Sequence, residues 1–187
     1  NITVADGVIA ANITAQNEIS GSIVSTNGAI SGTITALLGD LSGNVTAGVG
    51  NIASIVVGGD IDGSAISAED DITSIAVTGA ILAGTTITAS DADVDGTGNI
   101  GTIIAGDGIN ATIAAVNIDT IRSGGLAGED IEGTITASGD IDLVDAGNGI
   151  IEATVTAGVA VPGSPLATFI SDGYSYAVWA ISGTPTS

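Results

Sequence analysis

The sequence predicts an all-β fold, a β-solenoid followed by a non-repeat carboxyl-terminal strand segment. Three observations predict this class. Apolar and polar residues alternate strictly over short runs, one short unit recurs along most of the chain, and glycine-rich breaks separate its copies. Alternation with period two is typical of strands with one buried face. A unit that recurs along the chain is typical of repeat architectures.

The repeat unit is a large apolar residue, then Gly or Ala two places on, then Ile or Val, then Ala or Ser, with polar residues between. Ile and Val at the large positions favour strands because β-branched side chains pack well on a pleated surface. Breaks such as Gly39-Asp40 and Gly139-Asp140 predict turns. Clear copies of the unit span 9–15, 19–25, 30–36, 41–47, 109–115, 131–137 and 151–157.

An antiparallel sandwich also accepts many short strands, but its strands differ because each meets different neighbours. In a solenoid each coil lies on the previous one and equivalent positions stack on themselves, so the same order recurs. The recurrence favours the solenoid. The alternation slips by one residue around Ala65-Ile66 and again from Ala83 to Ile87. We expect a bulge or an altered corner at both slips, since otherwise the wrong face would turn inward.

The predicted interior is slender and the chain divides in two. Of 187 residues, 44% are hydrophobic and only 2% are aromatic, so Ile, Val, Ala and some Leu fill the core in thin layers. All prolines and all aromatic residues lie beyond position 160. We therefore expect a solenoid repeat domain over residues 1–160 and a carboxyl-terminal capping or assembly segment over 161–187.

The charge of the chain restricts its partners. The formal net charge is -20, with Arg122 as the one basic side chain. Nucleic acid is not expected as a partner because phosphate binding depends on Lys and Arg, and cations are the natural small partners. No apolar run reaches the roughly 18 residues of a membrane helix, so no membrane insertion is expected. A chain that starts at Asn1 and lacks Met fits a processed, exported product, which predicts an extracellular or cell-surface location.

The sequence contains few of the side chain types that commonly catalyse reactions. The sequence holds no His and no Cys, and its one basic residue is an arginine. Ser-His-Asp and Cys-His arrangements, lysine nucleophiles and the usual zinc ligand sets are therefore excluded. Paired carboxylates could serve glycoside hydrolysis, but the repeat lacks the aromatic platforms that hold sugars. We expect Arg122 to pair with a nearby carboxylate and the protein not to be an enzyme.

One loop has the pattern of a calcium site. Asp91, Asp93, Asp95 and Gly96 match the opening of a D-x-D-x-D-G loop, in which carboxylate oxygens surround a hard cation. Thr97 could add a backbone carbonyl. An EF-hand is excluded because Thr102 stands where the bidentate Glu belongs. Two interpretations stay open, a looser calcium loop and a solvated acidic loop.

Two further patterns lie on outward positions. Asn12, Asn44 and Asn110 open N-x-T sequons, and the alternation turns these side chains outward, where a glycan would not disturb the core. Thr pairs such as Thr33 with Thr35 resemble the hydroxyl arrays of ice-binding solenoids, although exposed Thr is also a good strand residue. The other Thr pairs are at 86 and 88, 134 and 136, and 154 and 156.

The stretches ITASGDIDLVDAGNGI and SIVVGGDIDGSAISAEDDITSIAVTGAI resemble the degenerate repeats of bacterial cell-surface parallel β-helix proteins, of the filamentous-haemagglutinin and autotransporter-passenger kind. The resemblance covers roughly residues 1–160. It implies a right-handed parallel β-helix displayed outside the cell. This chain differs from those families in its short length and its aromatic carboxyl-terminal segment.

The leading functional hypothesis is a structural subunit of an extracellular fibre or cell-surface filament. A solenoid leaves an unpaired strand row at each end, which can bind another chain. We expect copies of the chain to assemble head to tail through these ends and the aromatic strand. The alternative is a monomeric calcium-dependent surface adhesin or an ice-binding solenoid. The residues expected at the assembly interface are Phe169, Tyr174, Tyr176, Val178, Trp179 and Ile181.

Overall fold

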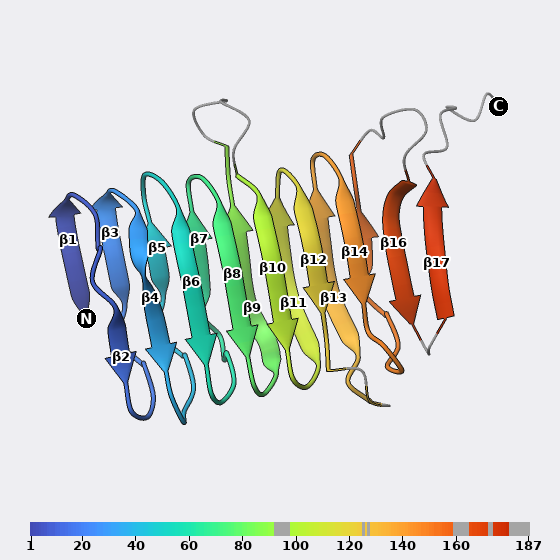
Figure 1. The fold of residues 1–187 in the computed structure, drawn as a ribbon, viewed down its shortest axis with the longest axis horizontal. Coiled ribbons are helices and arrows are strands. Elements are labelled where there is room, and N and C mark those ends of the chain that lie inside the picture. Colours follow the sequence, from blue (N-terminus) through green and yellow to red (C-terminus); the bar gives the residue numbers. More distant parts are fainter. Residues whose placement is uncertain (92–97, 125, 127, 159–164, 172–173, 180–187) are drawn as a thin grey trace.

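In a computed structural model the chain is a parallel β-solenoid of about seven turns, with two stacked sheets (Figure 1). The structure describes residues 1–91, 98–124, 126, 128–158, 165–171 and 174–179, and only the backbone of 165–167 and 174–179. Within these ranges there is no helix, and so none that could span a bilayer. The all-β solenoid predicted by the alternation and the recurrence is confirmed.

Sheet A has eight strands, and all of its neighbouring strands are parallel. Each coil contributes one strand to it, so the strands follow chain order. The strands, from the amino-terminal edge, are β1 (Ile2–Asp6), β3 (Ile23–Asn27), β5 (Val45–Ala47), β7 (Ala65–Ala68), β9 (Ile81–Ala89), β11 (Ile109–Ala115), β13 (Ile131–Ala137) and β15 (Thr154–Thr156).

Sheet B has nine strands and differs from sheet A at its last pair. Its first eight strands are parallel, whereas β17 turns back and pairs antiparallel with β16. The strands are β2 (Ile13–Ala15), β4 (Ile30–Ala36), β6 (Ile52–Val57), β8 (Ile72–Val77), β10 (Ile100–Ala105), β12 (Ile118–Arg122), β14 (Ile141–Asp145), β16 (Pro165–Ser171) and β17 (Tyr174–Trp179).

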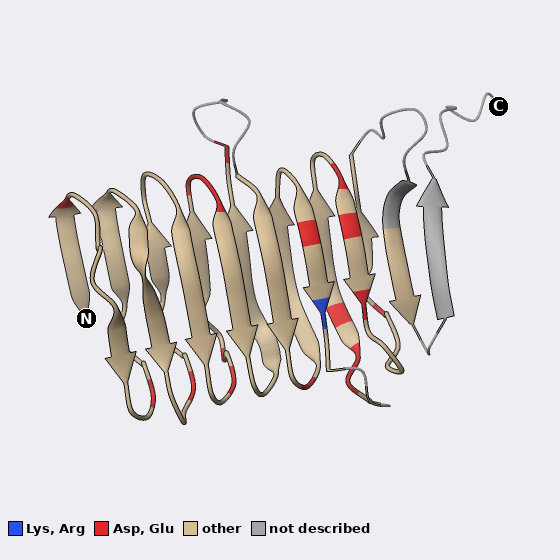
Figure 2. Cartoon of the chain, in the orientation of Figure 1, with Lys and Arg blue, Asp and Glu red and all other residues tan. Residues whose placement is uncertain are grey.

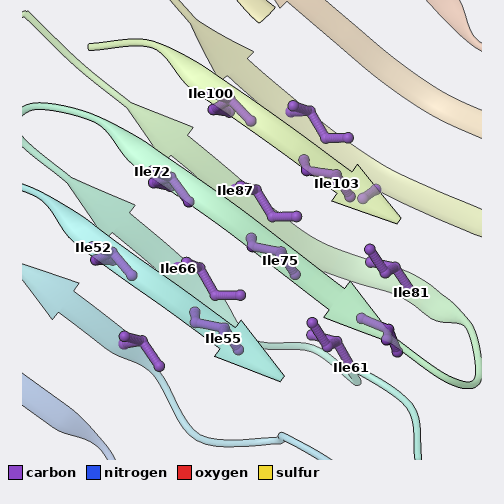
Figure 3. Close-up of a cluster of buried hydrophobic side chains, with 14 of the residues drawn as sticks. Ile52, Ile55, Ile61, Ile66, Ile72, Ile75, Ile81, Ile87, Ile100 and Ile103 are labelled. Carbon is purple, nitrogen blue, oxygen red and sulfur yellow. The ribbon is translucent and has the colours of Figure 1, made fainter. Parts of the chain in front are cut away.

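The core lies between the two sheets and consists of columns of stacked aliphatic side chains. Figure 3 shows Ile66 and Ile87 from sheet A beside Ile55, Ile75 and Ile103 from sheet B. The parallel registers place Ile66 over Ile87 and Ile75 over Ile103, and all of these residues are buried. The slender aliphatic interior expected from the composition is confirmed for the described residues.

Both slips of the alternation are absorbed at a glycine of sheet A, just before β7 in the first case and within β9 in the second. Gly63 has a φ of 63° and Gly84 a φ of 89°, a backbone region that glycine occupies without strain. The residue after each glycine, Ser64 or Thr85, points inward and is buried. Their hydroxyls donate to the carbonyls of Leu41 (2.8 Å) and Ile61 (3.3 Å) in the preceding coil. The bulges therefore leave no buried hydroxyl unpaired.

A ladder of Asn and Asp side chains connects the coils just before the strands of sheet B. Asn51 Oδ1 accepts from the backbone N–H of Asp71 at 2.9 Å, and Asp71 Oδ1 accepts from that of Asn99 at 2.8 Å. Asn117 donates to Asn99 Oδ1 at 2.8 Å and accepts from the N–H of Asp140 at 3.0 Å. Three of these bonds satisfy a backbone amide in a turn, and the bond from Asn117 to Asn99 joins two side chains. This ladder explains why Asn or Asp recurs directly before the first Ile of β6, β8, β10, β12 and β14.

Candidate functional site: the ends and outer faces of the solenoid

The amino-terminal end of the solenoid exposes the edges of β1 and β2. Ile2, in β1, is 40% exposed, because the structure places no coil on that side of it. Asn1 Oδ1 accepts from the N–H of Ser22 at 2.9 Å, which fixes the start of β1 on the second coil. A surface hollow of about 220 Å³ at this end is lined by Asn1, Ile2, Ile13, Glu18, Ile19, Ser20, Gly21, Ser22 and Ile23.

The carboxyl-terminal end is open on sheet A and covered on sheet B. β15 has β13 on one side and no described strand on the other, whereas β16 has β17 beyond it. Where the core ends, a cavity of about 390 Å³ is lined by Ile151, Ala153, Val155, Phe169 and Ser171. These side chains are only partly buried, and no further coil of the described residues covers this last layer of the core.

The predicted assembly residues fall mainly in the β16–β17 hairpin. Phe169 is half-buried and packs against the end of the aliphatic core. Its backbone partner in β17 is Tyr176, and Trp179 lies opposite Pro165. Tyr174 and Val178 are also in β17. The side chains of these β17 residues, and the whole of Ile181, lie outside the described residues.

The predicted calcium loop lies almost wholly outside the described part of the chain. Asp91 is described, two residues after the end of β9. Asp93, Asp95 and Thr97 fall in the undescribed range 92–97, so their arrangement around an ion stays a prediction. Among the described residues no three acidic side chains are grouped closely enough to hold a metal ion.

The sequon asparagines lie on the outside of the solenoid, and each forms a hydrogen bond to the next coil. Asn12 and Asn44 are exposed, and their Oδ1 atoms accept from the backbone N–H groups of Thr33 and Ala65, each at 2.9 Å. Asn110 is half-buried, and its Nδ2 donates to Glu132 at 2.6 Å. The attachment atom of Asn110 is thus engaged, whereas Asn12 and Asn44 use their carbonyl oxygens. Glycosylation of the three stays a prediction.

The predicted Thr pairs divide between the two sheets. Thr33 and Thr35 lie in β4 of sheet B, whereas the other three pairs lie in β9, β13 and β15 of sheet A. In the intervening strand β11 the equivalent positions are Thr112 and Ala114. Sheet A therefore has two columns of small polar side chains at its carboxyl-terminal half, with one gap. Sheet B continues only the column of Thr33, through Ser54, Ser74, Thr102 and Thr120.

Acidic residues lie in the turns and in strands of both sheets. Figure 2 shows them in β13 of sheet A and in β12 and β14 of sheet B. A shallow pocket of about 550 Å³ there is lined by Asp71, Asp119, Asp140 and Asp142, together with Asn99 and Asn117 of the ladder. Burial raises the pKa of Asp119, and the carboxylates of Asp142 and Asp71 raise it further. Sequence reasoning missed this pocket, because only the stacking of coils brings these aspartates together.

The single arginine forms the expected ion pair. Arg122, at the end of β12, contacts the carboxylate of Asp145 through Nη2 at 2.7 Å and Nε at 2.8 Å. Asp145 is the register partner of Arg122 in β14, and its side chain is only 5% exposed. It also accepts from the N–H of Gly147 at 2.8 Å. The predicted pairing of Arg122 with a carboxylate is confirmed.

Comparisons with protein-family models, with curated proteins and with solved structures found no match for this chain.

Proposed function

We propose that the chain is a structural subunit of an extracellular fibre or cell-surface filament that assembles head to tail. The observation that carries this proposal is that β1 and β15 are the open edges of one parallel sheet. The two edges belong to opposite ends of the molecule, so a contact between them leaves a free edge on each copy. Such a heterologous contact continues indefinitely unless its rotation closes a ring.

The resemblance to bacterial surface β-helix proteins agrees with this role, and so does the composition of the interior. Backbone pairing and aliphatic columns give a rod, and the ends of this rod leave strand edges open. The carboxyl-terminal cavity presents the unfinished core layer of Ile151, Val155 and Phe169. An apolar opening of this kind is stabilised when another apolar surface covers it.

The test of the fibre is assembly of the purified full chain. We expect sizing and electron microscopy to show filaments whose length grows with protein concentration. A dispersed monomer at every concentration and salt condition would exclude the fibre. A cysteine pair checks the end contact: Thr3→Cys with Thr156→Cys should give disulfide-linked ladders of subunits. The offset pair Thr3→Cys with Thr136→Cys is the matched control, because Thr136 lies one strand inside the edge.

Cations are proposed partners of the fibre, because chains of net charge -20 repel one another. We expect assembly to weaken at low ionic strength without divalent ions and to recover when calcium or salt is added. Chelation separates two cation roles. A loss of assembly with the chelator at constant ionic strength indicates bound divalent ions, including calcium in the loop at 91–97, whereas recovery by any salt indicates screening alone.

A second candidate function is favoured by the Thr columns of sheet A. Strand spacing and alternation place their hydroxyls on a grid of about 4.8 by 6.6 Å, and Thr86, Thr134 and Thr154 on it are exposed. A regular array of hydroxyls and methyls is suited to hold ordered water, as an ice-binding surface does. Thermal hysteresis of the monomer, abolished by Thr134→Lys, would establish this role. Its absence would leave the Thr columns as ordinary strand residues.

A further inference from the structure

The two open edges of sheet A belong to the same columns of the solenoid. Strand pairing connects Ile2 through one column of inward residues to Val155, and Thr3 through one column of outward residues to Thr156. If a second copy continues the sheet, its Ile2 falls on Val155 and its Thr3 falls on Thr156. The contact then repeats the parallel pairing that already joins neighbouring coils.

The residues of β1 and β15 that would pair at this edge have compatible, uncharged side chains. Asn1, Ile2 and Thr3 face Thr154, Val155 and Thr156, and none of these side chains carries a charge. This matters in a chain of net charge -20, because like charges directly opposite each other destabilise a strand pair. On the inner side, the partly exposed Ile2 would cover the cavity at Val155.

On sheet B the same contact meets an obstacle. A second copy that places its β1 beside β15 brings its β2 to the edge of β16, because β1 and β2 belong to one coil. That edge is occupied by β17, whose register partners run from Pro165–Trp179 to Ser171–Tyr174. β17 is the one antiparallel strand of the described residues. The incoming β2 and the chain's own β17 therefore compete for the same row of backbone groups.

Building on the fibre proposed above, we infer that β17 is a displaceable cap that controls head-to-tail assembly. In the capped chain β17 pairs with the backbone groups at the edge of β16. It thereby prevents a second copy from pairing with both sheets at once. When β17 leaves that edge, the β2 strand of a second copy takes its place while the β1 strand of that copy pairs with β15. A sheet edge that is covered in the monomer is a common protection against premature assembly.

A reversible lock on the hairpin tests this inference. Thr168 and Ala177 lie directly opposite each other, and opposed residues of antiparallel strands have Cα atoms about 4.5–5.5 Å apart, within the range of a disulfide. The chain has no native cysteine, so Thr168→Cys with Ala177→Cys can form only the designed intrachain bond at low protein concentration. We expect the oxidised variant to stay monomeric by sizing and electron microscopy. After reduction it should form filaments at the rate of the wild type in the same reductant.

The controls separate failure of the cap from failure of the fibre. Thr168→Cys alone, which cannot lock the hairpin, should assemble after the same oxidation and quenching of its free thiol. A second lock, Ile170→Cys with Ser175→Cys, uses another opposed pair and excludes a defect at one position. If both locked chains assemble as fast as the wild type, the cap inference is overturned and the fibre stands. If the wild type forms no filament under any condition, the fibre proposal fails, and the cap inference fails with it.

Discussion

Sheet A and sheet B are built from the same repeat, yet they differ at the carboxyl-terminal end and on their outer faces. Sheet A ends in an open parallel edge at β15 and carries small neutral side chains, including Thr134 and Thr154. Sheet B ends in an antiparallel hairpin and carries the acidic pocket around Asp119 and the ion pair of Arg122. A shared core therefore does not make the two faces equivalent. In the proposed fibre, the open edge of sheet A is where the next copy pairs, and sheet B holds the β17 cap.

The largest effect is expected in the core, where the two sheets should behave alike. Ile87 in sheet A and Ile103 in sheet B are both fully buried. Truncation of either residue to Ala should lower the free energy of unfolding by about 2–5 kcal/mol, through lost burial and the cavity left behind. Denaturant unfolding of the two variants measures this. A loss below about 1 kcal/mol for one sheet only would show that its layer is not packed as described.

A smaller, sheet-specific effect is expected at the ion pair of sheet B. Arg122→Met keeps the aliphatic stem but leaves the carboxylate of Asp145, which is 5% exposed, without its charged partner. We expect the unfolding free energy to fall by about 1–3 kcal/mol. This loss is smaller than that expected for a fully buried ion pair, because Arg122 itself is half exposed. The double variant Arg122→Met with Asp145→Asn should recover much of the loss. Equal losses in the single and double variants would contradict this account.

The ladder of Asn and Asp side chains should contribute to the free energy of unfolding about what its hydrogen bonds contribute. Asn117→Ala removes the donor to Asn99 and the acceptor for the N–H of Asp140. At about 1 kcal/mol for each bond, the unfolding free energy should fall by about 1–2 kcal/mol. The matched control is Asn17→Ala, at an exposed turn position, which should change stability by less than about 0.5 kcal/mol. Equal effects at the two positions would mean that the ladder adds nothing.

The smallest effect is the pH dependence of the acidic pocket. Because burial and the neighbouring carboxylates of Asp142 and Asp71 raise the pKa of Asp119, its ionised form destabilises the folded state. The folded chain therefore binds its proton more readily than the unfolded chain does, and stability rises as the pH falls through the folded pKa of Asp119. Asp119→Asn should be slightly more stable than the wild type at neutral pH, and the difference should shrink as the pH falls. A difference that grows on acidification would contradict the sign.

The sequence was enough to predict the solenoid because residues that stack on one another occupy the same position in successive repeat units. Ile23, Val45 and Ile66 occupy equivalent places in their units and lie in one column of the structure. Even the slip at Ala65 was visible, because one extra residue in the unit requires a bulge or an altered corner. The pairing of Arg122 was also predictable, because the acidic chain offers it many carboxylates and no competing base.

The sequence could not predict which side chains meet across coils. Asp71, Asp119 and Asp142 are far apart along the chain and share a pocket only because β8, β12 and β14 follow the stacking order of sheet B. The direction of β17 was equally hidden. Alternation in GYSYAVWAIS predicts a strand but does not distinguish a parallel coil from an antiparallel return, because the side-chain period is the same for both.

If copies stack end to end with β17 displaced, as proposed, the subunit rise along the filament has a definite value. With β17 out of the stack, each copy adds eight strand rows to either sheet, and eight spacings of about 4.8 Å give a rise of about 38 Å. Helical reconstruction from electron micrographs measures this rise. A rise of about 38 Å with strands perpendicular to the axis is the predicted result. A rise of about 43 Å, which would keep β17 in the stack, or particles that never exceed one chain would contradict the account.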